Sequence, residues 1–82
     1  MIILYPLSTE KTIRLMESEN TLLFIVDKKA TKQQVKEAVE TQFSAHVKTV
    51  NTGIGPDGKK KAYVRFAADT PAIDIATRLG LM

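Results

Sequence analysis

At 82 residues, with 44% apolar and 26% charged residues, the chain has the size and composition of one small folded domain spanning residues 1–82. It holds no cysteine and one histidine, which excludes disulfides and thiolate metal sites and leaves little for the common catalytic machineries, so we expect no enzyme, metal site or cofactor. The net charge of +3 favours anionic partners.

The N-terminal segment predicts a short strand followed by a helix. Residues 2–5 are apolar, and Pro6 ends the strand. Ser8 or Thr9 can cap the helix, whose first turn carries the Glu10 carboxylate where the helix dipole favours an acid. We expect its buried stripe to consist of Thr12, Ile13 and Met16.

A strand, a long helix and a second strand are predicted next. After a turn at Asn20, residues 22–26 form a β-rich apolar run that we expect to be covered on both faces. Thr31 is a good N-cap for the helix, and residues 47–52 form the following strand. The spacing of apolar residues predicts a buried helix face of Val35, Ala38, Val39, Gln42 and Phe43.

The C-terminal part predicts a hairpin and a last helix. Residues 53–58 are rich in turn formers, and residues 60–66 alternate as a strand. We expect Thr70 to cap the helix, with Pro71 in its first turn and Gly80 just after its end. The predicted buried positions are Ile73, Ile75, Ala76 and Leu79.

These elements predict an α+β fold in the order β-α-β-α-β-β-α. The strands at 21–26 and 47–52 flank a helix, so we expect them to be parallel, with a right-handed crossover. The strand at 60–66 returns antiparallel, either at the sheet edge or between the other two, as in the split βαβ of ferredoxin-like folds. The predicted sheet is small and mostly antiparallel, with three to four strands and the helices packed on it.

The cations are gathered in two blocks, and this is the main functional signal of the sequence. Lys61, Tyr63 and Arg65 share one face of a predicted strand, where a ring between two cations could stack on a base while the cations neutralise phosphates. A solvated edge protected by lysines explains that face equally well. Cations at the start of the long helix, where the dipole disfavours them, favour RNA binding. The blocks are Lys28, Lys29, Lys32 and Lys36, and Lys59, Lys60, Lys61 and Arg65.

Other candidate motifs are explained by ordinary structure. Residues 53–58 match GxGxxG, but a dinucleotide fingerprint needs a following helix, and a strand is predicted here. Glu37 and Glu40 are expected on a solvated helix face, and Glu10 and Arg14 have the spacing of a helical ion pair. No apolar run is long enough to cross a bilayer and no signal peptide is recognised, so we expect a cytoplasmic protein without membrane insertion.

Three segments carry a family resemblance. Residues 6–11, PLSTEK, fit an opening motif Pro-x-x-Ser/Thr-Glu-Lys, residues 30–40 fit a central helix, and residues 50–52 with 58–64 fit a hairpin. Together these segments resemble the large-subunit ribosomal protein family L-twenty-three, over essentially the whole chain and at the right intervals. Each motif alone is weak, but the set is highly specific.

The resemblance implies a ribosomal protein that binds large-subunit rRNA near the polypeptide exit tunnel, beside neighbouring large-subunit proteins. It also implies a docking surface for the signal recognition particle and other nascent-chain factors, to which Glu10 would belong. Bacterial members have a long basic hairpin that reaches the tunnel wall. Only residues 53–58 join the strands here, which is far too short to reach the tunnel interior, so the chain resembles the compact archaeal-type form. The implied RNA contacts are Lys32, Lys36, Asn51, Thr52, Lys59, Lys60, Lys61 and Tyr63.

Two other functions remain open at this point. One is a free-standing ferredoxin-like module that binds mRNA or tRNA. Such modules usually carry two or three exposed sheet aromatics, whereas only Tyr63 stands out on a basic strand face. The other is an acylphosphatase-like enzyme, which would need an arginine near an anion-cradling first loop, and residues 6–9 supply none.

Overall fold

Four strands and three helices make up the computed structural model, which describes residues 2–80. In chain order they are β1 (Ile3–Pro6), α1 (Glu10–Glu19), β2 (Thr21–Val26), α2 (Lys32–Phe43), β3 (Val47–Ile54), β4 (Lys60–Phe66) and α3 (Ala72–Arg78). This order confirms the one predicted from the sequence. The described residues include no helix that is long and apolar enough to span a bilayer.

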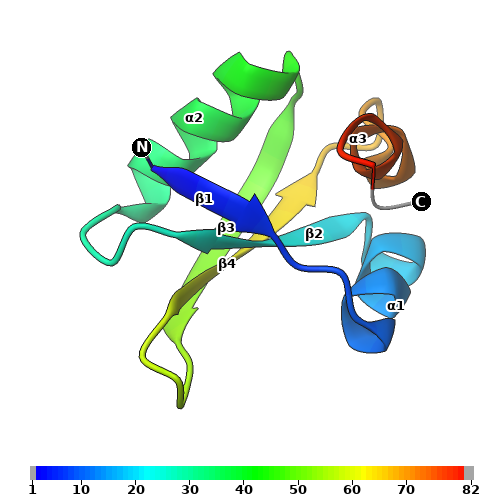
Figure 1. The fold of residues 1–82 in the computed structure, drawn as a ribbon. Coiled ribbons are helices and arrows are strands. Elements are labelled where there is room, and N and C mark those ends of the chain that lie inside the picture. Colours follow the sequence, from blue (N-terminus) through cyan, green and yellow to red (C-terminus); the bar gives the residue numbers. More distant parts are fainter. Residues whose placement is uncertain (1, 81–82) are drawn as a thin grey trace.

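The strands form one sheet in the order β1-β2-β4-β3, and each neighbouring pair is antiparallel (Figure 1). β4 lies between β2 and β3, which therefore run parallel to each other and are connected through α2. The predicted split βαβ unit is confirmed, and the alternative that placed this strand at the sheet edge is wrong. β1 adds to the other side of β2 as an edge strand, which completes a small α+β fold.

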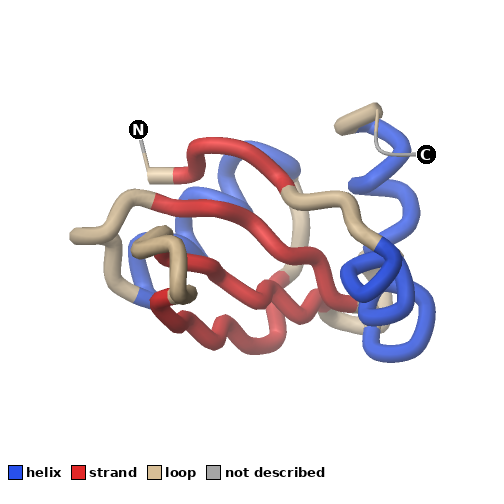
Figure 2. Tube along the Cα trace, turned by 60° about the horizontal axis from the view of Figure 1, so that its bottom comes forward, coloured by secondary structure: helices blue, strands red, loops and turns tan. Residues whose placement is uncertain are grey.

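The helices cover one face and one end of the sheet. α2 lies over one face, whereas α1 and α3 lie together at the end of the sheet (Figure 1). In Figure 2 the strands lie in front of α2, and no helix crosses their near side. We call this side the helix-free face. It carries the outward side chains of β4, so the layout of the helices decides which functional residues are accessible.

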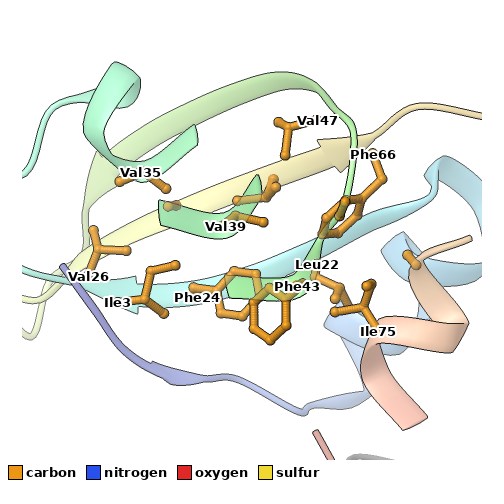
Figure 3. Packing of buried hydrophobic residues seen from close by; sticks show 14 of the residues in the cluster. Ile3, Leu22, Phe24, Val26, Val35, Val39, Phe43, Val47, Phe66 and Ile75 are labelled. Carbon is orange, nitrogen blue, oxygen red and sulfur yellow. The ribbon is translucent and has the colours of Figure 1, made fainter. Parts of the chain in front are cut away.

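The hydrophobic core lies between α2 and the sheet. Val35, Val39 and Phe43 of α2 point towards β2 and β4 (Figure 3). The rings of Phe24 and Phe43 are stacked with centroids 6.1 Å apart. Burying a side chain of this size contributes roughly 1.5–3 kcal/mol. The predicted both-sided burial of the strand at 22–26 is confirmed, because every residue of β2 is buried.

Both long helices begin at the predicted caps. The Thr9 hydroxyl accepts a hydrogen bond from the Thr12 backbone N–H, and the Thr31 hydroxyl accepts one from Gln34. In each case the side chain of the third helical residue accepts a hydrogen bond from the backbone N–H of the cap, which completes a capping box. The start of α2, and with it the loop that carries Lys28 and Lys29, is therefore fixed by local hydrogen bonds.

The predicted cap of the last helix is wrong. Thr70 does not cap α3, whose N-cap is Pro71 and has no side-chain hydrogen bond of its own. The Thr70 hydroxyl instead accepts a hydrogen bond from the backbone N–H of His46. The N–H of Ala72 is satisfied by the Asn20 side chain from a distant part of the chain.

Several predicted boundaries and buried positions also differ from the structure. Ile13 and Ile73 are 36% and 47% exposed, and Gln42 is exposed as well. Helical spacing assigned them to the core because each lies next to a true core position, but α1 and α3 bury only narrow stripes at the end of the sheet. β3 extends to Ile54, two residues beyond its predicted end, which shortens the hairpin loop. β1 includes Pro6 and begins one residue later than predicted.

Candidate nucleic-acid interface

The helix-free face gathers aromatic and cationic side chains from β1 and β4. Side chains alternate along a strand, so Lys61, Tyr63 and Arg65 lie on the side opposite Ala62, Val64 and Phe66, which are buried in the core. In the sheet register Lys61 pairs with Ile25 of β2, which in turn pairs with Tyr5 of β1. Tyr5 therefore belongs to the same face, although its sequence position did not suggest it.

A hollow of about 580 Å³ opens where this face meets two loops. Lys28 and Lys29 come from the β2–α2 loop, and Lys59 comes from the end of the β3–β4 hairpin. Figures 1 and 2 place both loops at the end of the sheet that lies away from α1 and α3. Lys28 and Lys29 of the first basic block and Lys59 of the second, about 30 residues apart in the sequence, are thus brought together. We call this feature the Tyr5 hollow, with apolar wall residues Leu4, Tyr5 and Ile25 and cations Lys28, Lys29 and Lys59.

Lys59 is held against Tyr5. Its Nζ donates a hydrogen bond of 3.0 Å to the Tyr5 hydroxyl and lies 5.7 Å from the centre of the ring. The hydrogen bond from Lys59 to Tyr5 raises the pKa of the Lys59 ammonium above its ordinary value of 10.5. The contact orients both side chains at the mouth of the hollow.

The β3–β4 hairpin presents Lys59 through a tight turn. The backbone N–H of Gly58 donates to the Gly55 carbonyl at 2.9 Å, and Gly58 has φ of 79°, a left-handed conformation that glycine adopts without strain. Asp57 accepts a hydrogen bond from the backbone N–H of Lys59, which lowers the pKa of its carboxyl. The turn chemistry inferred from Pro56-Asp57-Gly58 is confirmed.

Lys60 differs from its two lysine neighbours. It lies on the core-facing side of β4, opposite Val26, and its Nζ donates a hydrogen bond to the backbone carbonyl of Ala30. This contact joins the hairpin to the loop that precedes α2. The ammonium of Lys60 therefore has a structural partner, and its main role in the free protein is to hold the two basic loops together.

The remaining predicted RNA contacts are divided between the two sides of the sheet. Asn51 pairs with Tyr63 and is exposed on the helix-free face, whereas Thr52 pairs with buried Ala62 and is half-buried. Arg65 lies at the α1 end of the sheet, where it lines a second hollow, separate from the Tyr5 hollow, together with Glu19. Lys32 and Lys36 lie on α2, in the other layer of the fold. The structure thus gathers Lys28, Lys29, Lys59, Lys61, Asn51 and Tyr63 near one face, and leaves Lys32, Lys36 and Thr52 outside it.

Glu10 lies at the opposite end of the molecule. It occupies the first turn of α1, where its carboxylate accepts a hydrogen bond of 2.7 Å from Arg14, and both side chains are exposed. The helical ion pair expected from their spacing is confirmed. Because α1 lies away from the two basic loops (Figure 1), Glu10 and the Tyr5 hollow can serve different partners.

The cations of the Tyr5 hollow form no ion pair within the part of the chain that the structure describes, although the charge of Asp57 acts on Lys59. Ion pairs formed by residues 2–80 join Glu10 to Arg14 and His46 to Asp69. The same residues contain no cluster of three or more potential metal ligands. Asp27 lines the hollow, but its carboxylate accepts a hydrogen bond from the backbone N–H of Lys29. The arrangement is suited to binding a polyanion.

Sequence reasoning missed Tyr5 and Asn20. Tyr5 joins the interface only because β1 pairs with β2 in one register, with an irregularity between Ile3 and Tyr5 that no local pattern reveals. The Asn20 side chain forms hydrogen bonds with backbone groups 50 and 52 residues away in the sequence. A weak signal for Asn20 exists, since asparagine after a helix often adopts a left-handed C-cap.

Comparison with known families identifies the family of the chain. The family model for ribosomal protein L23 matches residues 1–76, which is nearly the whole chain. That family is a structural component of the large ribosomal subunit in the cytoplasm and takes part in translation, in agreement with the resemblance seen in the sequence. The chain therefore belongs to the ribosomal protein L23 family and is a structural constituent of the ribosome.

Proposed function

We propose that this protein, acting as a single domain, binds large-subunit rRNA through the Tyr5 hollow and the adjoining helix-free face, near the polypeptide exit tunnel. The observation that carries the proposal is the convergence of Lys28 and Lys29 with Lys59 around Tyr5, with no paired carboxylate among residues 2–80. Lys28 and Lys29 are about 30 residues from Lys59 in the sequence, so nothing local requires them to lie close together. Their meeting supports one polyanion site rather than scattered solvated lysines.

The mechanism is electrostatic docking guided by shape. Lysines that replace the counterions of RNA phosphates release those ions, and this release supplies most of the affinity. Contacts to phosphates set position but read no sequence, so orientation must come from rigid geometry. Here the capping box at Thr31 and the Lys60 hydrogen bond to Ala30 fix the two basic loops relative to each other. No cofactor or reacting group is required.

A second surface is proposed for protein partners. We infer that α1, with Glu10 exposed in its first turn, is part of the docking surface for the signal recognition particle and other factors that meet the nascent chain. Its separation from the basic loops supports this assignment, because rRNA bound at the Tyr5 hollow would leave α1 accessible. The short hairpin supports a position on the subunit surface, since the loop between Ile54 and Lys60 is too short for a long reach.

The rRNA proposal is tested by two charge-matched double variants. Lys28→Ala with Lys59→Ala removes two cations of the Tyr5 hollow, and Lys11→Ala with Lys48→Ala removes two exposed cations outside it. Filter binding with a large-subunit rRNA transcript gives the slope of the logarithm of the binding constant against the logarithm of the salt concentration. The first variant should lower the size of this slope by roughly 2, and the control variant should lower it by much less. Equal effects of the two variants, or no effect of either, would contradict the proposed site.

A further inference from the structure

We propose that the Tyr5 hollow holds one unpaired nucleotide, with its base against the apolar wall and its phosphate among Lys28, Lys29 and Lys59. This inference rests on the proposed rRNA binding and makes it more specific. It states that the site recognises a single-stranded, splayed-out position in the RNA and not only the charge of a duplex backbone.

The wall of the hollow is apolar where electrostatic docking alone would not require it. Leu4 and Tyr5 are 49% and 40% exposed on the edge strand β1, directly beside the cations. Ile25, which is buried, also lines the hollow. Aromatic and aliphatic surface of this kind matches the flat apolar face of a base, and stacking on an aromatic side chain is favourable for every base.

The cations are placed to hold a phosphate next to that base. Lys28 lies near the hairpin, because a Cβ added at Gly58 would be 3.9 Å from its Nζ, so the lysines of the two loops border the same space. Lys59 already contacts Tyr5, so the charged group and the ring are adjacent before any ligand binds. Asp27 also lines this hollow, where its carboxylate accepts a hydrogen bond from the Lys29 backbone N–H, and Asp57 lies in the adjoining turn; among residues 2–80 neither forms an ion pair with the three lysines.

The size of the hollow favours a single nucleotide. Its volume of about 580 Å³ lies within the range of small-molecule pockets, which is roughly 300–1,000 Å³. A base inside a duplex is stacked and paired and does not present its face, whereas bases in loops and bulges can be splayed out onto a protein. The hollow therefore selects an unpaired position, and duplex RNA can offer it only phosphates.

The proposal can be tested with the full chain and short RNA probes. Fluorescence anisotropy would compare a labelled uridine hexamer with the same hexamer carrying abasic sugars, which keeps the phosphates and removes the bases. The abasic probe should bind about tenfold more weakly, because a stacked base contributes roughly that much. Tyr5→Leu should weaken the uridine hexamer by a similar factor and leave the abasic probe unchanged, while Tyr5→Phe, which keeps the ring, should bind the hexamer within about twofold of the unmodified protein.

The outcomes separate this proposal from the broader one. If the abasic probe and Tyr5→Leu both bind normally while the Lys28→Ala, Lys59→Ala double variant binds weakly, the nucleotide site is wrong and electrostatic docking stands. If the lysine variant also binds normally, both are wrong. No binding of the hexamer at about 1 mM would overturn the nucleotide site in favour of a protein neighbour on the apolar wall. If circular dichroism shows Tyr5→Leu to be unfolded, Leu4→Ala replaces it, with an expected weakening of about threefold.

Discussion

The Asn20 side-chain oxygen accepts a hydrogen bond of 2.6 Å from the backbone N–H of Ala72, 52 residues further along the chain. Asn20 is the left-handed C-cap of α1, with φ of 53°. Its amide nitrogen donates to the carbonyls of Phe66, Ala67 and Thr70 at 3.0–3.2 Å. One side chain thus caps α3, closes the end of β4 and fixes α1 beside both.

Replacing Asn20 should destabilise the fold strongly. Asn20→Gly keeps the left-handed backbone but removes the hydrogen bonds to Phe66, Thr70 and Ala72, and leaves the Ala67 carbonyl with only the Thr70 N–H. At about 0.5–1.5 kcal/mol for each hydrogen bond, we expect a loss of about 3 kcal/mol. In a domain of this size that corresponds to a fall in melting temperature of about 12–24 °C. Asn20→Ala should lose about 1 kcal/mol more, because alanine is strained at this φ. Thermal unfolding followed by circular dichroism measures both changes.

Ser44 provides the control for Asn20. It is the left-handed C-cap of α2, with φ of 50°, and its exposed side chain makes no hydrogen bond within residues 2–80. Ser44→Gly should change stability by less than about 1 kcal/mol, because relief of backbone strain offsets the entropy of the added glycine. If Asn20→Gly were as mild as Ser44→Gly, the side-chain hydrogen bonds of Asn20 would not hold the two helices.

Substitution by methionine should lower the stability of the fold at Lys60 and the salt dependence of rRNA binding at Lys59. Lys60→Met removes the hydrogen bond to Ala30 while keeping an unbranched stem, and should cost about 1 kcal/mol in urea unfolding without changing the salt slope of rRNA binding. Lys59→Met, at an exposed position, should leave stability within about 0.5 kcal/mol and lower the slope by roughly 1. A slope lowered equally by Lys60→Met would show that its ammonium leaves Ala30 to bind a phosphate.

Local chemistry carried most of the fold prediction. Thr9 and Thr31 were identifiable as caps because a capping box lies within four consecutive residues, and β4 because its alternation extends over seven. Thr70 also had the residue type and position of a cap, but an asparagine from another element occupies that role. Such a bond depends on which helices lie side by side, and no spacing within the last helix reports it.

The candidate site was predictable in its charges but not in its shape. The two lysine blocks were visible in the sequence, yet the division of Lys59, Lys60 and Lys61 between two sides of β4 needed the register of the sheet. Predicting the position of Tyr5 requires two registers, that of β1 on β2 and that of β2 on β4. An aromatic next to a proline reads as the end of a strand, so nothing local connected it with a hairpin 54 residues away.

Acid should remove a contribution that Asp69 makes to stability. The hydrogen bond between Asp69 and His46, at 2.8 Å, lowers the pKa of the Asp69 carboxyl below its ordinary value of 3.8. A lowered folded-state pKa means that the unfolded chain binds the proton more readily, so the contribution is present above pH 3.8 and is lost as pH falls through the folded value. Between about pH 2 and 6, the free energy of unfolding of Asp69→Asn should depend less on pH than that of the unmodified protein. Asp74→Asn, at an exposed carboxylate in α3, should retain the dependence of the unmodified protein.

Docking at Glu10 should be separable from stability. The exposed pair with Arg14 contributes roughly 0.2–0.5 kcal/mol, so Glu10→Ala should barely change unfolding. If the carboxylate also contacts a nascent-chain factor, the same variant should weaken co-sedimentation of the signal recognition particle with ribosomes that carry it. Arg14→Ala should not weaken co-sedimentation, because it removes the same ion pair but leaves the Glu10 carboxylate free for the factor. Equal loss of co-sedimentation in both variants would show that the ion pair, as an element of α1, matters and that Glu10 is not itself the contact.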